Sequence, residues 1–428
     1  AQLLRWEAEI ATMISDLAQW AERIPPRDPS TGRFVDAFER ATQHFARTDF
    51  SRELQTFWRS RHIDKPEIRS NIFVAELRFT GDMPTLTADF SHVAQLSLLG
   101  NDALKVSDGF LSGFRRLQAL ELRTFALGRI PPALNRMPTL KSLVLSSCGI
   151  VFDAEGQAAL SSLSRLRALD LHNNPLVEVP DVSALPEMMF LDLSKTSIDR
   201  IPSGLSSLPH LEDVMLNENN ISELPDELLN LPADVAQSID LHDNPISAVA
   251  RERIKVCYQT SGYTFGVPVE AMDRELALTL YPDLTDSQIN ELVYSLPGTL
   301  ADGHIELVRR TTELATLTHE LDAWANETPL DPASRSPLTG DALRQEQANR
   351  QSLKQSLENC WRRIVAQGQN EFEFNLNVPV SGDLPTPTAD FAHVRTVFLV
   401  NGSGAPSRLG QFLKLFPNAE KLAIQGYQ

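Results

Sequence analysis

The sequence predicts an α/β fold in which short parallel strands stack into a solenoid with helical caps, followed by the start of a second copy. The main observation is a leucine frame, Leu-x-x-Leu-x-Leu-x-x-Asn, which is clearest from Leu166 to Asn174. Its last position recurs at Thr196, Asn219 and Asn244, a period of 22 to 25 residues. A frame of this form with a period of about 20 to 29 residues is the leucine-rich-repeat signature. The second observation is a duplication with a much longer period, of roughly 300 residues.

Each frame predicts one strand whose leucines point inward, because alternate residues of a strand face opposite sides. A single repeat cannot bury its leucines alone, so the repeats must stack, with their strands on the concave face. More degenerate frames end at Asn101, Phe125 and Cys148. With residues 74–79 they extend the predicted sheet to eight strands, the last ending at 241. The register predicts that six leucines are buried: Leu169, Leu171, Leu191, Leu193, Leu216 and Leu241.

The chain is expected to divide into five parts. These are an N-terminal helical pair (1–65), a leucine-rich-repeat solenoid (66–250), a helical connector and C-terminal cap (251–304), a second helical pair (305–370) and a truncated second solenoid (371–428).

The first helical pair is predicted from apolar residues spaced three and four apart between Leu3 and Trp20. We expect a second helix from about 34 to 58, with Phe38, Phe45, Leu54 and Trp58 facing inward. The pair either caps the open edge of the first strand or docks a partner. Capping is favoured, because the terminal repeats of a solenoid expose apolar edges.

The connector is predicted as short helices at about 250–258, 273–280 and 285–296. The first should close the solenoid with Arg251, Arg253 and Lys255 outward. The last begins with a capping box, Thr285-x-x-Gln288.

The longer repeat has a unit of roughly 300 residues. Trp324 repeats Trp20 at an offset of 304, Trp361 repeats Trp58 at 303, and segment 382–394 repeats 81–93 at 301. The second copy stops inside its third strand, near 422–424, so we expect the chain to be a fragment of a longer protein. The repeated Thr-Ala-Asp-Phe-x-His segment holds an Asp and a His, but its Phe and Val fit core positions and favour a structural role.

The composition excludes several classes of function. A net charge of −17 over 428 residues argues against binding to nucleic acid and against docking on an anionic membrane. No apolar run approaches membrane-spanning length, and the N-terminus has no signal-peptide pattern. Cys148, Cys257 and Cys360 lack paired spacing, which favours free thiols in a reducing compartment over disulfides or a zinc site. Cys148 stands where other repeats have Asn, so we expect a structural thiol.

No motif of a catalytic, phosphate-binding or metal-binding site occurs, so no catalytic residue, cofactor or metal is expected. What remains is the concave face, where residues between the strand leucines point to solvent. Asp170 and Asp192 should lie about 5 Å apart on adjacent strands, and such like charges cost stability without an evident benefit to folding. The face is therefore either kept for binding or is merely solvated. Its candidate binding residues are Glu121, Arg123, Asp170, His172, Phe190, Asp192, Asp213, Met215, Asn217, Asp240 and His242.

The repeats, as in Ile201–Leu211, resemble the leucine-rich-repeat regions of bacterial effector proteins, including type III secreted LRR ubiquitin ligases. The helical pair with Trp20 and Trp58 is similar to the N-terminal part of a Xanthomonas-type ligase of this group. The resemblance implies a protein that resides in the bacterial cytoplasm before secretion and enters a host cell afterwards. In one class of the group catalysis rests on a Cys-x-Asp motif, which none of the three cysteines here matches.

The sequence thus favours a target-recognition module of a larger bacterial effector or toxin-like protein, binding a host protein with a basic patch. One alternative is the substrate-recognition part of a ubiquitin-ligase effector whose catalytic domain is absent from this chain. Another is a structural or adhesive surface protein. The oligomeric state stays open.

Overall fold

The computed structural model describes residues 2–60, 71–331, 334–363, 373–376, 380, 383–389, 391–400 and 409–425. The chain forms two compact units, Ala1–Val267 and Pro268–Gln428. The boundary between them falls inside the segment predicted as a connector.

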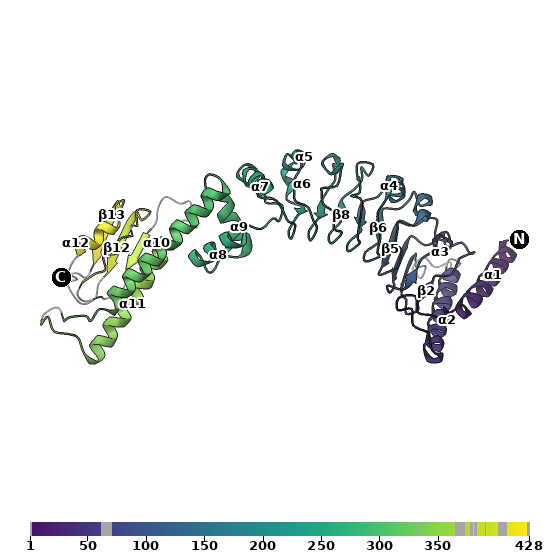
Figure 1. Cartoon of the computed structure of the whole chain (residues 1–428), viewed down its shortest axis with the longest axis horizontal. Coiled ribbons are helices and arrows are strands. Elements are labelled where there is room, and N and C mark those ends of the chain that lie inside the picture. Colours follow the sequence, from purple (N-terminus) through teal and green to yellow (C-terminus); the bar gives the residue numbers. More distant parts are fainter. Residues whose placement is uncertain are drawn as a thin grey trace. The chain divides into compact units, whose positions relative to one another are not determined.

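The first unit is built on one eight-stranded sheet, in the order β1-β3-β5-β6-β7-β8-β9-β10. Every adjacent pair is parallel, and the strands follow the inner curve of this unit (Figure 1). This confirms the predicted leucine-rich-repeat solenoid. The strands are β1 (Ile72–Glu76), β3 (Gln95–Leu99), β5 (Ala119–Arg123), β6 (Ser142–Val144), β7 (Ala168–Asp170), β8 (Phe190–Asp192), β9 (Asp213–Met215) and β10 (Ile239–Asp240).

The register is also the predicted one, since the six leucines singled out in the sequence each have 0% of their surface exposed. Short helices return the chain along the outer side (Figure 1). They are α3 (Asp108–Leu111), η1 (Pro132–Arg136), α4 (Ala154–Ser161), η2 (Leu205–Ser207), α5 (Asp226–Leu229) and α6 (Ala233–Ala236). A small parallel pair, β2 (Gly81–Asp82) and β4 (Leu104–Lys105), lies beside the first repeats.

A buried side-chain ladder holds neighbouring repeats together at the last position of each frame. The Asn219 Nδ2 donates to the carbonyls of Leu193, 2.7 Å away, and Leu216, 3.0 Å away. Its Oδ1 accepts from the backbone N–H of Thr196 at 2.8 Å. One amide therefore satisfies backbone groups of two repeats that water cannot reach. Asn174 and Asn244 do the same in their own repeats.

The residue before each ladder position adopts the left-handed conformation, with φ between 53° and 60°, at Thr124, Ser147, Asn173, Lys195, Glu218 and Asp243. Such a conformation costs roughly 1–3 kcal/mol when the residue is not glycine. In the first five of these residues the N–H group donates to a carbonyl of the next repeat, as Lys195 does to Asn217 at 3.1 Å, and this bond offsets the strain.

Cys148 is a ladder residue, as predicted. It is fully buried, and its backbone N–H donates to Asn174 Oδ1 at 2.9 Å. Its Sγ lies 3.3 Å from the carbonyl oxygen of Leu122. Burial raises the pKa of this thiol to about 11, so it stays protonated at neutral pH and is a poor nucleophile.

The first helical pair consists of α1 (Gln2–Glu22) and α2 (Ala37–Ser60). The indole N–H of Trp20 donates to the carbonyl of Asp82 at 2.8 Å. The fully buried Arg47 donates to the carbonyls of Trp20, Arg23 and Thr80 at 3.1, 3.0 and 2.7 Å. These bonds fasten the pair to the start of the solenoid.

The pair also packs its rings on the first strand. Phe57 and Phe50 lie edge-on to Phe73 of β1, with ring centroids 5.0 and 6.3 Å apart. His92, from the repeated Thr-Ala-Asp-Phe-x-His segment, stacks on Phe57. Asp89 accepts the N–H of Ser91 at 2.9 Å in a local turn, so this segment has structural contacts.

The prediction that Phe38 and Phe45 face inward is wrong. They are 80% and 68% exposed. The buried face of α2 is set by Phe50, Leu54 and Trp58, which recur every four residues. At about 100° per residue, Phe38 and Phe45 lie on the opposite side of the helix.

The predicted connector forms three helices: α7 (Ala248–Ser261), α8 (Ala271–Leu280) and α9 (Asp286–Ser295). The first belongs to the first unit, and the other two pack with α10 (Leu300–Asn326) of the second. The capping box of Thr285 and Gln288 is confirmed. The expectation that Lys255 points outward is wrong: it is 1% exposed, because it lies on the face of α7 that also buries Ile254.

The second unit continues with α10 (Leu300–Asn326), α11 (Gly340–Arg362), α12 (Leu409–Phe412), η3 (Leu413–Leu415) and the parallel strands β11 (Glu373–Leu376), β12 (Thr396–Val400) and β13 (Lys421–Gln425). Its contacts repeat those of the first unit. Trp324 donates its indole N–H to the carbonyl of Asp383 at 2.8 Å, and Arg350 donates to the carbonyl of Trp324 at 2.9 Å.

Strand pairing repeats as well. Glu373 opposite Thr396 matches Ile72 opposite Gln95, with both partners shifted by 301. Trp324 and Trp361 are buried like Trp20 and Trp58. The predicted duplication therefore extends to local structure, although Gly382 and Asp390 of the repeated segment lie outside the described residues.

The ladder can be tested by Asn219→Ala. We expect the free energy of unfolding to fall by about 2–4 kcal/mol, because buried backbone groups of two repeats lose their partner. Chemical denaturation measures this. Asn220→Ala is the matched control, since that exposed side chain makes only one long bond, 3.3 Å to the carbonyl of Ser197. Equal stability of the two variants would contradict the ladder's role.

Candidate protein-binding surface

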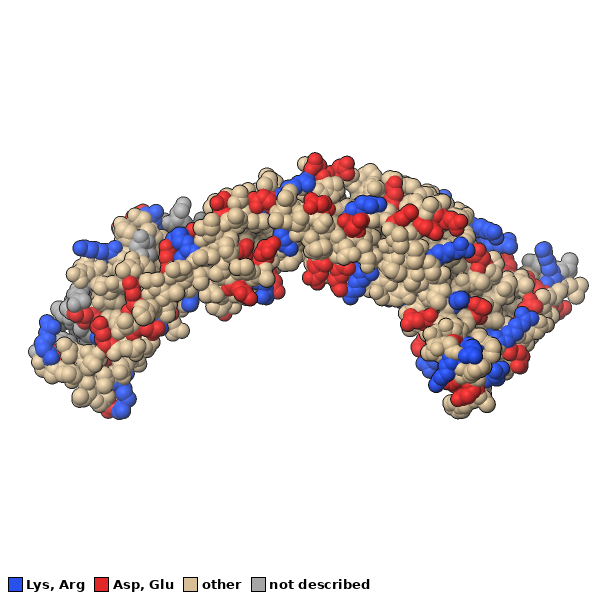
Figure 2. All heavy atoms as spheres, viewed as in Figure 1, with Lys and Arg blue, Asp and Glu red and all other residues tan. Residues whose placement is uncertain are grey.

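The concave face brings four of the predicted carboxylates into one patch on β7 to β10. Asp170 lies directly opposite Asp192, which lies opposite Met215, which in turn lies opposite Asp240. Asp213 is opposite Phe190 in the neighbouring row. Figure 2 shows acidic side chains gathered on the inner margin of the first unit. We call Asp170, Asp192, Asp213 and Asp240, with Phe190 and Met215, the acidic patch.

A hydrogen-bond chain runs across the first two strands of this patch. Asp192 accepts from the Ser194 hydroxyl at 2.5 Å, and the Ser194 Oγ lies 2.7 Å from the His172 Nδ1. Since the hydroxyl proton goes to Asp192, His172 must carry its own proton on Nδ1. Asp170 accepts the backbone N–H of His172 at 2.8 Å.

The expectation that these aspartates bring no benefit to folding is therefore wrong. Asp170, Asp192 and Asp240 each accept the N–H of the residue two positions later, at 2.8 to 3.0 Å. Short side chains that bond a nearby N–H stabilise the turn where a strand ends. The carboxylates thus have a structural use, and only their charge needs another explanation.

The charge does carry a cost. Partial burial raises the pKa of Asp170 above its ordinary value, and the Asp192 carboxylate adds to that effect. Partial burial also raises the pKa of Asp213, with Asp192 and Asp240 contributing. Asparagine could make the same turn bonds without this repulsion. The four negative charges are therefore not required by the turn bonds.

The apolar members of the patch are half-buried. Phe190 and Met215 each lie beside an aspartate on the adjacent strand. They offer an apolar contact ringed by carboxylates. His242 closes the far end of the row, with its Nδ1 2.7 Å from an Asp240 carboxylate oxygen.

Three of the predicted residues lie away from the patch: Glu121, Arg123 and Asn217. Glu121 forms an ion pair with Arg123 and accepts from the Ser97 hydroxyl at 2.8 Å. The pair lies on β5, and Val144 of β6 separates it from Asp170. Asn217 lies two residues beyond the end of β9, and its carbonyl accepts from the backbone N–H of Lys195.

One ion pair at the margin of the acidic patch was not predicted from the sequence. Lys195 and Glu218 occupy successive left-handed positions and form an ion pair of 3.1 Å beside the patch. Each residue stands directly before the ladder residue of its repeat, so the sequence could have revealed that the two side chains are neighbours.

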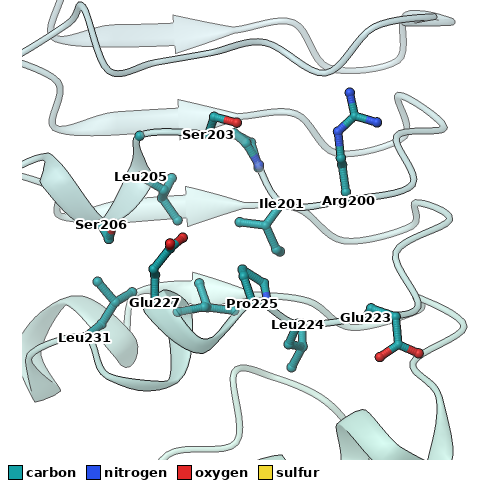
Figure 3. A pocket seen from close by; sticks show the side chains of 13 residues that line it. Arg200, Ile201, Ser203, Leu205, Ser206, Glu223, Leu224, Pro225, Glu227 and Leu231 are labelled. Carbon is teal, nitrogen blue, oxygen red and sulfur yellow. The ribbon is translucent and has the colours of Figure 1, made fainter.

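A hollow of 360 Å³ lies on the convex side, between two repeats (Figure 3). Ile201 and Leu205 line one side, and Leu224, Pro225 and Leu231 line the other. Its walls are residues of the repeat pattern itself, so the hollow is a seam between neighbouring repeats.

The described residues contain neither a cluster of metal ligands nor a membrane-spanning helix. No group of three or more His, Cys, Asp or Glu there could hold a metal ion. None of the described helices combines the length and apolar character needed to cross a bilayer.

Comparison with known proteins finds leucine-rich-repeat proteins, and no family model matches the chain. A mouse protein, leucine-rich repeat and IQ domain-containing protein 4, is 43% identical over 74 residues, which are 17% of this chain and 12% of that protein. Bovine fibromodulin is 35% identical over 134 residues, 31% of this chain and 34% of its own length. The chain thus spans about a third or less of these relatives.

Solved structures that resemble the chain are also leucine-rich-repeat proteins. The leucine-rich-repeat domain of the type III effector XopL is 17% identical with a TM-score of 0.37, covering 55% of this chain and 87% of that domain. An internalin of Listeria monocytogenes is 16% identical with a TM-score of 0.33, covering 42% of this chain and 49% of its own. Likenesses this weak say nothing about function.

The cost of the charge can be separated from the benefit of the hydrogen bond at Asp170. Asp170→Asn keeps the acceptor for His172, so we expect it to raise the free energy of unfolding at pH 7 by about 0.5–1 kcal/mol. Asp170→Ala loses the acceptor and should lower it by about 1 kcal/mol.

The pH dependence has a definite sign. A raised pKa in the folded state means that the charged form is penalised at neutral pH, and protonation removes the penalty. The advantage of Asp170→Asn should therefore vanish as pH falls through the raised pKa towards the ordinary value of 3.8. Denaturation curves at several pH values measure it, and a constant advantage would contradict the electrostatic cause.

Proposed function

We propose that this chain is a protein-interaction module that binds a protein ligand carrying a basic patch through the acidic patch of the solenoid. The supporting observation is the row of carboxylates on adjacent strands, whose charge is costly and is not needed for the turn bonds. Basic groups of a ligand would relieve the repulsion on binding. Phe190 and Met215 would supply apolar contact, which usually provides most of the affinity of such interfaces.

We further propose that the module recognises targets for a larger bacterial effector, made in the bacterial cytoplasm and delivered into a host cell. The support is the resemblance of the repeats, as in Ile201–Leu211, to those of such effectors. A ubiquitin-ligase effector is the narrower form of this proposal. Discharge of ubiquitin from a charged conjugating enzyme by the protein that contains this chain would support it, and its absence would leave target recognition alone.

The binding surface can be tested by changing Asp170→Asn and Asp192→Asn together. Both substitutions keep the turn acceptors, so folding should be preserved. Charge complementarity acts mainly on association, so the double variant should bind a captured partner about 10-fold more slowly at low salt and show weaker salt dependence. Pull-down from host lysate, then binding kinetics at two salt concentrations, measures this.

Met215→Ala serves as the counterpart, because loss of an apolar contact speeds dissociation and leaves association nearly unchanged. Asp243→Asn, which changes an exposed charge outside the patch, is the control. Unchanged kinetics in both patch variants would mean that the acidic patch is solvated surface only.

A further inference from the structure

The outer face of α2 carries exposed aromatic side chains that lie outside the packed core. Phe34, just before the helix, is 66% exposed, and Phe38 and Phe45 are 80% and 68% exposed. Phe38 and Phe45 are two helical turns apart, so they share one face, with Ala41 and Thr42 between them. We call these five residues the α2 stripe. Clustered exposed apolar side chains on a folded protein mark an interaction site.

The duplication provides an internal comparison. The buried face of the helix is retained in the second copy, where Arg350, Leu357 and Trp361 match Arg47, Leu54 and Trp58 at an offset of 303. The stripe is not retained: the positions of Phe34, Phe38 and Phe45 are held by Pro337, Asp341 and Ala348. A helical pair of this kind therefore folds without the aromatic residues, and their presence in the first copy needs a reason outside the pair.

The order of residues along the stripe is self-complementary. It reads large, small, small, large at Phe38, Ala41, Thr42 and Phe45. If two such helices pack antiparallel about a twofold axis between Ala41 and Thr42, each Phe38 meets the partner's Phe45, and the small residues meet at the centre.

The charges at the ends of the stripe are also complementary in this arrangement. The Arg27 guanidinium lies over the Phe34 ring, 3.7 Å from its centroid. About the same axis, Phe34 lies at the level of Asp49, which pairs with Arg52 of its own helix at 2.7 Å and stays partly exposed on the stripe side. Arg27 of each copy would thus face Asp49 of the other. The helix itself has four Arg against three acidic residues, in a chain of net charge −17, so repulsion between copies is weak there.

We propose that the α2 stripe is a homodimer interface that a second copy of this chain occupies, with the α2 helices antiparallel. Three phenylalanines, each able to bury about 150–250 Å², place the interface at the small end of specific interfaces. The dimer is accordingly reversible, with a dissociation constant on the order of 10 µM.

The experiment is sedimentation velocity on the full chain over about 1 to 200 µM, a range that brackets this affinity. We expect the sedimentation coefficient to rise from monomer to dimer across the range. Phe38→Glu with Phe45→Glu should hold the protein as monomer throughout, with an unchanged circular dichroism spectrum. Ala348→Glu, the matching change in the second copy, should dimerise like the wild type.

A mixing experiment tests the antiparallel pairing independently. Arg27→Glu and Asp49→Arg should each weaken the dimer several-fold, because like charges then meet at both ends. An equimolar mixture of the two variants restores opposite charges in the mixed dimer and should regain most of the wild-type association.

Monomeric wild type at every concentration would overturn the proposal, as would a dimer that survives the double glutamate change. Loss of association with no recovery in the mixture would overturn the antiparallel arrangement.

Discussion

The structure of the first unit depends on the buried amide ladder. Its strands are only two to five residues long, too short to hold a sheet by themselves. At each turn the chain reverses through a left-handed residue that is strained unless it is glycine. The ladder residue that follows, such as Asn219, compensates by bonding groups of its own repeat and of the one before. This contact ties neighbouring repeats together and so helps to keep the side chains of the concave face aligned.

The sequence predicted most of this because the ladder and the leucines are periodic. Asn174, Thr196 and Asn219 mark the turns, and the leucines between them mark the buried face. The helical pair was harder to interpret. Hydrophobicity alone predicts that Phe38 and Phe45 lie in the core. In the structure the core instead contains the Arg47 guanidinium, which donates hydrogen bonds to three backbone carbonyls. Hydrophobicity identifies a core position only when no buried polar network competes for it.

The sequence likewise predicted only part of the candidate site. The sequence predicted which side chains share the concave face, because facing follows from register. It could not show that Asp170 and Asp192 also close turns, since a side chain bonding to a nearby N–H depends on local backbone geometry. Nor could it separate Glu121, which is ion-paired with Arg123, from Asp170, Asp192 and Asp213, which form no ion pair with a Lys or Arg of the described residues. The structure confines the candidate binding surface to four of the strands on the concave face, β7 to β10.

The duplicated helical pair has a consequence for how many ligands the chain can hold. Each copy begins with its own anchored pair, so each solenoid has its own starting point and can diverge without disturbing the other. If the second solenoid also binds a ligand, the second binding event becomes intramolecular, at an effective concentration set by the connection between the two solenoids. A target that presents two sites would then be held far more tightly than either surface alone allows. Such a chain can bind a target with two sites tightly and selectively even if each of its two contacts is weak and unselective alone.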